Sequence, residues 1–205
     1  AIDSPLRVAL GLISSKQSKA TKDTEAQAQQ ILNYCATNPE AEIIYRRSDM
    51  ILTIDSDAAY LVAPKARSRA AGFFYLGNKD GKLFNGPIFI LTKIIKAVMA
   101  SAAEAECAGL YLNAHESVPM QTTLIELGHP QPATPVQVDN TTAIAIANKT
   151  CKQVRSKAID MRFYWVQDRV DQGQFHIFWA PGADNVGDYY TKHHPIYHHR
   201  DIRPT

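Results

Sequence analysis

The sequence predicts an α/β fold in which helices flank a mixed five-stranded sheet. Three strand-like segments follow one another from residue 43 and are joined by short connections, which is typical of an antiparallel meander. From residue 101 onward, helical and strand-like segments alternate. A meander followed by such alternation implies a mixed sheet with helices packed on it. The length of 205 residues suits one such domain with an extension, or two small domains.

The first predicted element is a helix over residues 24–36, which an Asn-Pro pair at 38–39 ends. Apolar residues recur in it at helical spacing, namely Ala28, Ile31, Leu32 and Cys35. A polar stretch at 14–22 precedes this helix and suits a linker or a contact surface. Because the chain has no starting methionine, we expect it to be part of a longer protein.

The strands of the meander are marked by runs of β-branched and aromatic residues. The first strand is predicted at 43–45 and 50–54, the second at 72–77, and the third at 87–91 with an extension toward 98. A loop rich in proline and basic residues at 64–69 separates the first two strands. Turn residues at 78–81 separate the second from the third.

The clearest helix start is at Ser101, because Ser101 and Glu104 fit the S-x-x-E capping box. This helix is expected to run to about residue 115, and Pro119 is expected to open a separate helix that stops at Gly128. The remaining predicted elements are a strand at 136–139, a small helix at 141–148, an amphipathic helix at 156–171, a strand at 175–179 and a last helix at 184–192.

Composition and charge exclude several classes of protein. A net charge of only +2 excludes a polycation, so any nucleic-acid contact must come from local patches. The three cysteines, Cys35, Cys107 and Cys151, form no CxxC pair. So few cysteines argue against a disulfide framework and favour a reducing compartment, and we expect the protein in the cytoplasm. No apolar run approaches the 18 residues of a membrane-spanning helix, so we expect no membrane contact.

Four carboxylates stand at the ends of predicted elements. Asp57 follows the first strand, Glu106 lies early in the helix after Ser101, Asp139 ends the fourth strand and Asp188 lies in the last helix. Sites in open α/β folds collect at such strand ends. Clustered carboxylates tolerate one another best around hard divalent cations such as Mg²⁺. A pair of such ions is a common device for phosphodiester cleavage.

Spacing alone leaves alternatives open. The chain has 20 acidic residues, so carboxylates at element ends could be helix caps, and Asp139 could cap the helix at 141–148. Asp55 and Asp57 lie two residues apart on a strand and therefore share a face, so either could serve. Glu104 is better explained as a capping-box residue, whereas Glu106 has no such structural explanation.

Five motifs that contain these residues occur in order. They are SDA at 56–58, SAAEAE at 101–106, VDNTTAI at 138–144, RSKAIDMR at 155–162 and DNVGDYYTK at 184–192. Together they resemble the ribonuclease H domain of Ty1/copia-type LTR-retrotransposon polyproteins, whose pattern is roughly SDAD, SSTEAEY, CDNxSAI, RSKHIDIR and DxxADxLTK. The resemblance divides the chain into a connecting segment at 1–42 with one helix, a ribonuclease H domain at 43–192 and a histidine-rich tail at 193–205.

The resemblance implies a ribonuclease H-like fold and hydrolysis of the RNA strand of RNA–DNA hybrids during reverse transcription. It implies two Mg²⁺ ions, for which Mn²⁺ can substitute, and a reverse transcriptase as partner in the same polyprotein, in the cytoplasm or in virus-like particles. The metal-binding catalytic residues that it implies are Asp57, Glu106, Asp139 and Asp188, and the match to SDA selects Asp57 over Asp55. The chain departs from the pattern at Ala59, Cys107 and Gly187, and none of these departures removes a metal ligand.

Two basic segments are candidates for contacts with the phosphates, which dominate nucleic-acid affinity. Residues 149–169 hold six basic residues against two acidic ones, although a solvated helix face would look the same. The loop at 64–69 is the second segment. Asn140 could contact the 2′-hydroxyl groups of RNA, or could equally be a turn residue. The candidate nucleic-acid-binding residues are Arg67, Arg69, Asn140, Lys152, Arg155, Lys157 and Arg162.

The last residues contain four histidines, at 193, 194, 198 and 199, without cysteine partners. This is a poor zinc site and favours a disordered or partner-docking tail.

Two rival functions remain open. A DDE integrase or transposase shares the fold and the metals, but it places its glutamate last, whereas Glu106 comes second here. The other rival is a catalytically inactive ribonuclease H-like module that binds nucleic acid or connects domains, and the intact set of four carboxylates argues against it.

Overall fold

The computed structural model describes residues 4–40, 42–150, 157–192, 194 and 197–199, and only the backbone of residues 157–160. Its centre is a five-stranded sheet with the strand order β3-β2-β1-β4-β5. Strands β1 (Ile51–Ala63), β2 (Arg67–Gly77) and β3 (Pro87–Ile94) form an antiparallel meander. Strands β4 (Thr134–Val138) and β5 (Phe175–Trp179) continue the sheet parallel to β1. The predicted mixed sheet is confirmed, and its order and directions match the ribonuclease H-like fold.

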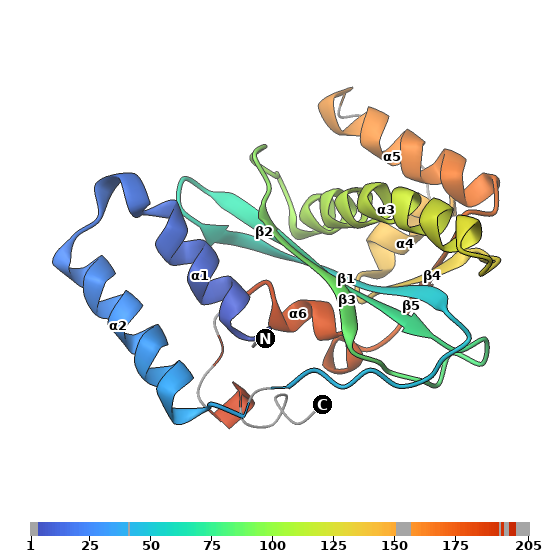
Figure 1. Ribbon diagram of the computed structural model, residues 1–205. Coiled ribbons are helices and arrows are strands. Elements are labelled where there is room, and N and C mark those ends of the chain that lie inside the picture. Colours follow the sequence, from blue (N-terminus) through green and yellow to red (C-terminus); the bar gives the residue numbers. More distant parts are fainter. Residues whose placement is uncertain (1–3, 41, 151–156, 193, 195–196, 200–205) are drawn as a thin grey trace.

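Helices cover both faces of this sheet (Figure 1). Helix α3 (Ala102–Glu126) packs on one face of β1 and β2, with α4 (Thr141–Ala147) and α5 (Lys157–Asp171) beside it. On the other face lie α1 (Leu6–Ser15) and the short α6 (Val186–Tyr189), while α2 (Lys22–Thr37) packs against α1. The alternation of side chains along β1 separates the two layers, because Ile54 and Ala58 enter the core under α3 whereas Asp55 and Asp57 face α6.

The first strand begins later and ends later than predicted. Residues 43–50 form no strand, so the expected strand at 43–45 is wrong; isolated hydrogen bonds to Asn85 and Gly86 hold this segment instead. Pairing of β1 with β2 continues to Ala63↔Arg67, so the predicted loop at 64–69 shrinks to a tight turn at 64–66. Arg67 and Arg69 therefore belong to β2.

A single helix replaces the two helices predicted around Pro119. Pro119 lies inside α3, where proline costs about 3 kcal/mol relative to alanine. Contacts beyond Pro119 offset this cost: Leu124 is buried, and the Gln121 side chain donates to Thr134 Oγ1 at 2.6 Å and to the Gln174 carbonyl at 3.1 Å.

The two ends of the chain also differ from the prediction. The described part of residues 1–42 carries two α-helices rather than one, because α1 packs Val8 into the core between the sheet and α6. The predicted last helix at 184–192 is shorter: a 3-10 helix at Gly182–Asp184 precedes α6, and the Asn185 side chain caps α6 between them. Within the described residues, no helix is both long and apolar enough to cross a membrane.

Candidate active site

Three carboxylates meet where β1 and β4 separate. These parallel strands pair only at Ile54↔Val136 and Asp55↔Gln137. Asp57 lies on β1, two residues after Asp55 of the last pair. Asp139 lies two residues after Gln137 of that pair, just past the end of β4. Glu106 joins them from the first turns of α3, and one oxygen of each carboxylate lies within 4.8 Å of the others. We call Asp57, Glu106 and Asp139 the acidic triad.

Glu106 reaches the triad because α3 approaches β1 very closely at Gly109. A Cβ atom at Gly109 would lie 3.0 Å from the Ala58 Cβ and 3.2 Å from the Asp57 carbonyl oxygen. Glu106, one turn earlier, is only 7% exposed, and its carboxylate accepts a hydrogen bond from the Ala58 backbone. The other oxygen, Oε2, is buried and has no hydrogen-bond partner. A buried carboxylate oxygen that lacks a donor is a place for a cation.

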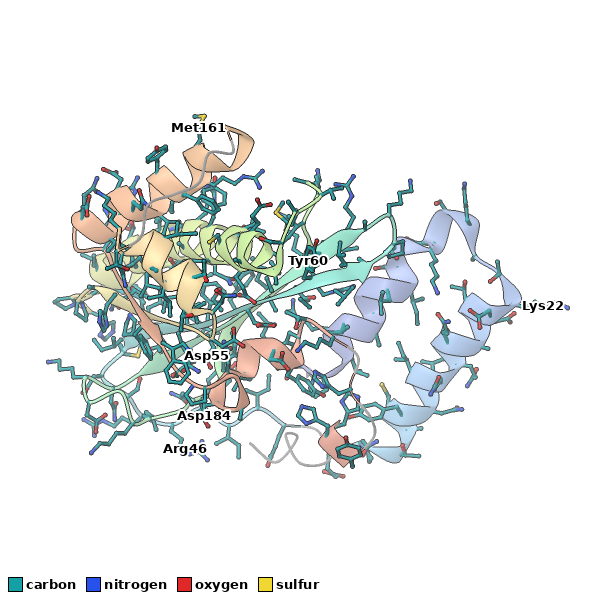
Figure 2. All side chains as sticks on the ribbon, turned by 180° about the vertical axis from the view of Figure 1, so that it is seen from behind. Lys22, Arg46, Asp55, Tyr60, Met161 and Asp184 are labelled. Atoms are coloured by element: carbon teal, nitrogen blue, oxygen red, sulfur yellow. The ribbon has the colours of Figure 1, made fainter. Side chains whose placement is uncertain are left out.

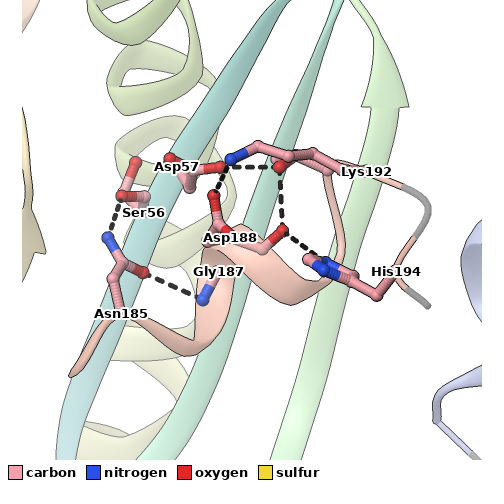
Figure 3. A network of polar contacts seen from close by, with 8 residues as sticks. Ser56, Asp57, Asn185, Gly187, Asp188, Lys192 and His194 are labelled. Atoms are coloured by element: carbon pink, nitrogen blue, oxygen red, sulfur yellow. Dashed lines mark hydrogen bonds and ion pairs between the residues drawn. The ribbon is translucent and has the colours of Figure 1, made fainter. Parts of the chain in front are cut away.

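Helix α6 brings Asp188 close to Asp57 (Figure 3). A Cβ atom at Gly187 would lie 3.1 Å from the Asp57 Cβ, so α6 also sits directly on β1. The Asn185 side chain donates to the Ser56 carbonyl at 2.8 Å and so anchors the start of α6. The structure thus places Asp188 beside the acidic triad but outside it, in an ion pair with Lys192.

Glu106 and Asp57 resist ionisation in this site. Burial, followed by the charges of Asp57 and Asp139, raises the pKa of Glu106 from 4.5 to about 9. Burial raises the pKa of Asp57 from 3.8 to about 6, although the hydroxyl of Thr191, which donates to Asp57 Oδ2 at 2.7 Å, opposes this rise. A divalent cation would remove both the repulsion and the unsatisfied oxygen, so the donor set fits a hard metal ion.

The structure separates Asp55 from Asp57, which spacing could not do. Asp55 lies next to α6 (Figure 2) and is buried there. Its carboxylate accepts a hydrogen bond from the Val186 backbone, and burial raises its pKa to about 7. The capping alternative for Asp139 is wrong, because the Asn140 side chain is the cap of α4 and accepts from the backbone of Thr142 and Ala143.

Glu104 takes the capping role expected of it. Ser101 Oγ accepts from the Glu104 backbone at 3.2 Å, and the Glu104 carboxylate accepts from the Ala100 backbone at 2.7 Å. It therefore lies outside the acidic triad.

The basic residues predicted to bind phosphates differ in their exposure. Arg69 is only 4% exposed, donates to Thr92 Oγ1 at 3.3 Å and is covered by α1, so its prediction as a phosphate ligand is wrong. Arg67 is half-buried, and the half-buried Arg162 lies over the Tyr111 ring at 5.6 Å from its centre. Lys152, Arg155 and the side chain of Lys157 lie outside the described residues.

The described histidines of the tail pack around Tyr189, next to Asp188. His194 stacks on the Tyr189 ring with centroids 5.2 Å apart, and His199 Nδ1 lies 2.5 Å from the Tyr189 hydroxyl. In the part of the chain that the structure describes, the acidic triad is the group with metal-ligand geometry, and it includes no histidine.

Sequence reasoning missed two residues that contact this site. Thr191 and Lys192 both lie in the last motif, and Lys192 stands four residues after Asp188, the spacing at which side chains of a helical turn meet. This four-residue spacing from Asp188 is the sequence signal that could have identified Lys192.

Fold and site together define a ribonuclease H-like domain with an acidic centre. No protein-family model matches the chain. The chain is 27% identical over 184 residues to the retrovirus-related Pol polyprotein from transposon TNT 1-94 of tobacco, Nicotiana tabacum. The match covers 90% of this chain but 13% of that polyprotein. This similarity confirms the resemblance to retrotransposon polyproteins that the five motifs indicated.

Solved structures give more distant likenesses. The N-terminal ribonuclease H domain of Rv2228c from Mycobacterium tuberculosis has a TM-score of 0.48 at 16% identity, over 69% of this chain and 91% of that one. LC11-RNase H1 from compost has a TM-score of 0.49 at 12% identity, over 69% and 92%. The ribonuclease H domain of prototype foamy virus has a TM-score of 0.40 at 13% identity, over 69% and 88%. The order and directions of the strands, not these likenesses, define the fold.

Proposed function

We propose that this chain is a ribonuclease H that hydrolyses the RNA strand of RNA–DNA hybrids by a two-metal mechanism. The observation that carries the proposal is the acidic triad with its buried, unpartnered Glu106 oxygen, set in a ribonuclease H-like fold. Similarity to a Pol polyprotein supports a role in reverse transcription of a retroelement, with a reverse transcriptase in the same polyprotein. The proposal includes the cytoplasm or a virus-like particle as the setting.

The residues present fit the two divalent ions that this function needs. Asp57, Glu106 and Asp139 would hold one ion, and Asp188, which lies near Asp57, would be a ligand of the second. All of these donors are carboxylate oxygens, which Mg²⁺ and Mn²⁺ accept readily. Bound there, the ions would activate a water molecule and stabilise the charge that develops on the scissile phosphate.

The chain's own residues orient these ligands. Thr191 donates to Asp57 Oδ2 and so fixes one oxygen of this ligand carboxylate. The Ala58 backbone does the same for Glu106. Ligands held in this way need little rearrangement on binding, which is how metal centres are kept in their reactive geometry.

Residues around the carboxylates would contact the RNA–DNA hybrid. Arg67, Lys152, Arg155, Lys157 and Arg162 remain candidates for the phosphates of the hybrid. The oxygen of the Asn140 side chain caps α4, so its amide nitrogen would be the group left for a 2′-hydroxyl.

A substrate comparison tests the proposal. Labelled RNA–DNA hybrid, double-stranded RNA and double-stranded DNA are each incubated with the protein in Mg²⁺ or in excess EDTA. We expect cleavage of the RNA strand of the hybrid in Mg²⁺ only. Glu106→Gln protein, purified identically, controls for traces of host ribonuclease. Undiminished cleavage in EDTA would contradict the metal mechanism, and equal cleavage of double-stranded DNA would contradict the substrate class. Absence of all cleavage would favour the inactive alternative.

A further inference from the structure

Asp188 has a partner of its own in this site. Its carboxylate forms an ion pair with the ammonium of Lys192, four residues later, instead of joining the acidic triad (Figure 3). The Lys192 charge also reaches the triad, because it lowers the pKa values of Asp57 and Glu106. Asp188 is thus already neutralised by a group of the protein itself.

The backbone around Lys192 is fixed so that its side chain enters the site. Thr191 is buried, and its hydroxyl donates to Asp57 Oδ2 at 2.7 Å and lies 2.9 Å from the Asp188 carbonyl oxygen. The next residue, Lys192, therefore leaves the chain at the edge of the carboxylates. Its side chain remains 48% exposed, so it can move into solvent without opening the core.

We propose that Lys192 is a tethered cation that occupies Asp188 until a second metal ion displaces it. This inference rests on the proposed metal site. Without nucleic acid, the acidic triad would then bind an ion readily, while binding at Asp188 would be weakened by the competing ammonium. Lys192 acts here through Asp188 and is a positioning residue.

Titration calorimetry with Mn²⁺, without nucleic acid, measures this competition directly. Lys192→Met removes the charge and keeps an unbranched side chain, so binding at the Asp188 side should strengthen at least about fivefold, or about 1 kcal/mol. Lys192→Arg keeps the charge and should behave as the wild type. Lys149→Met is the matched control, because Lys149 and Asp171 form the other ion pair of the described residues. Melting curves verify that each variant folds.

Asp188→Asn separates local competition from a general effect of charge. If Lys192 acts by occupying Asp188, the gain from Lys192→Met should vanish when Asp188→Asn is also present. A gain that persists in the double variant, or unchanged or weaker binding in Lys192→Met alone, would overturn the proposal. Failure of the proposed nuclease looks different, because the wild type would then bind Mn²⁺ without cleaving hybrid. If neither the wild type nor Lys192→Met binds Mn²⁺, both proposals are wrong.

Discussion

Glu106→Gln should make the metal-free protein more stable while it abolishes hybrid cleavage. In the absence of metal, Glu106 is buried, carries an oxygen without a donor and faces two other carboxylates. Glutamine has the same size and can still accept the hydrogen bond from the Ala58 backbone, but it carries no charge. The substitution therefore removes a metal ligand and, with it, a carboxyl group that must take up a proton on folding at neutral pH, which costs free energy.

The expected gain in the free energy of unfolding follows from the pKa of Glu106, which folding raises from 4.5 to about 9. A carboxyl group whose pKa is higher in the folded state destabilises the fold as pH rises between those two values, and each pKa unit corresponds to about 1.4 kcal/mol. At pH 7 the full penalty would be about 3 kcal/mol. Because part of the rise in pKa depends on the charges of Asp57 and Asp139, we expect a gain of about 1–3 kcal/mol, or about 3–10 °C in melting temperature.

Denaturation in EDTA at pH 4.5, 7 and 8.5 measures this gain. It should be close to zero at pH 4.5, where the wild-type carboxyl is protonated in the folded state and half-protonated in the unfolded chain, and it should grow toward pH 8.5. Glu104→Gln, the same change two residues earlier on α3, is the control and should stabilise the protein at no pH, because Glu104 accepts a capping hydrogen bond. Adding Mg²⁺ should stabilise the wild type more than Glu106→Gln. A variant that is no more stable than the wild type at pH 7, or a gain independent of pH, would refute the reasoning.

Three further predictions concern ligands, substrate and packing. Asp139→Asn should slow hybrid cleavage at least about a hundredfold, because it removes a ligand charge at constant size, whereas Asp55→Asn beneath α6 should cost far less; the reverse pattern would reassign the site. Replacing Arg155 and Lys157 together by Ala should weaken hybrid binding and flatten its salt dependence, since each phosphate contact adds roughly one unit to the slope. Titrations at several salt concentrations measure this, and an unchanged slope with full affinity would indicate a solvated helix face. Gly109→Ala should lower the free energy of unfolding by about 1–3 kcal/mol, because its Cβ would press on the backbone of β1; an unchanged denaturation midpoint would contradict this.

Elements with strong local signals were predictable from the sequence. The capping pair at Ser101 and Glu104 marks the start of α3, and the apolar stripe of α5 marks that helix, because both signals lie within one element. The predictions of a helix break at Pro119 and of a strand at 43–45 were wrong, because contacts with residues distant in the sequence determine the structure at both places. Gln121 donates to Thr134 of β4 and to the carbonyl of Gln174 just before β5, and these contacts stabilise the part of α3 that follows Pro119. Residues 43–45 lie outside the ladder that β1 forms with β2.

The site was predictable in its residue types but not in its exposure or its pairing. Arg69 is basic in the sequence, yet the pairing of β2 and the cover of α1 bury it, and a single sequence shows charge rather than burial. Asp55 and Asp57 share a strand face, so their spacing does not separate them. The SDA motif selects Asp57, and the structure agrees, because Asp57 joins the acidic triad whereas Asp55 lies beneath α6. The partnership of Asp188 with Lys192 likewise depends on how the turn after α6 is anchored.

The position of Asp57 is held by packing, because two helices contact β1 at this residue from opposite faces of the sheet. Helix α3 contacts its backbone through Gly109, and α6 contacts its Cβ through Gly187. Glu106 lies three residues before the first glycine, and Asp188 directly follows the second. A glycine contact holds helix and strand at backbone distance, and backbone positions adapt less than side chains do. The carboxylates are therefore positioned by the packing of regular elements, which is the kind of support that a metal centre with fixed ligand geometry requires.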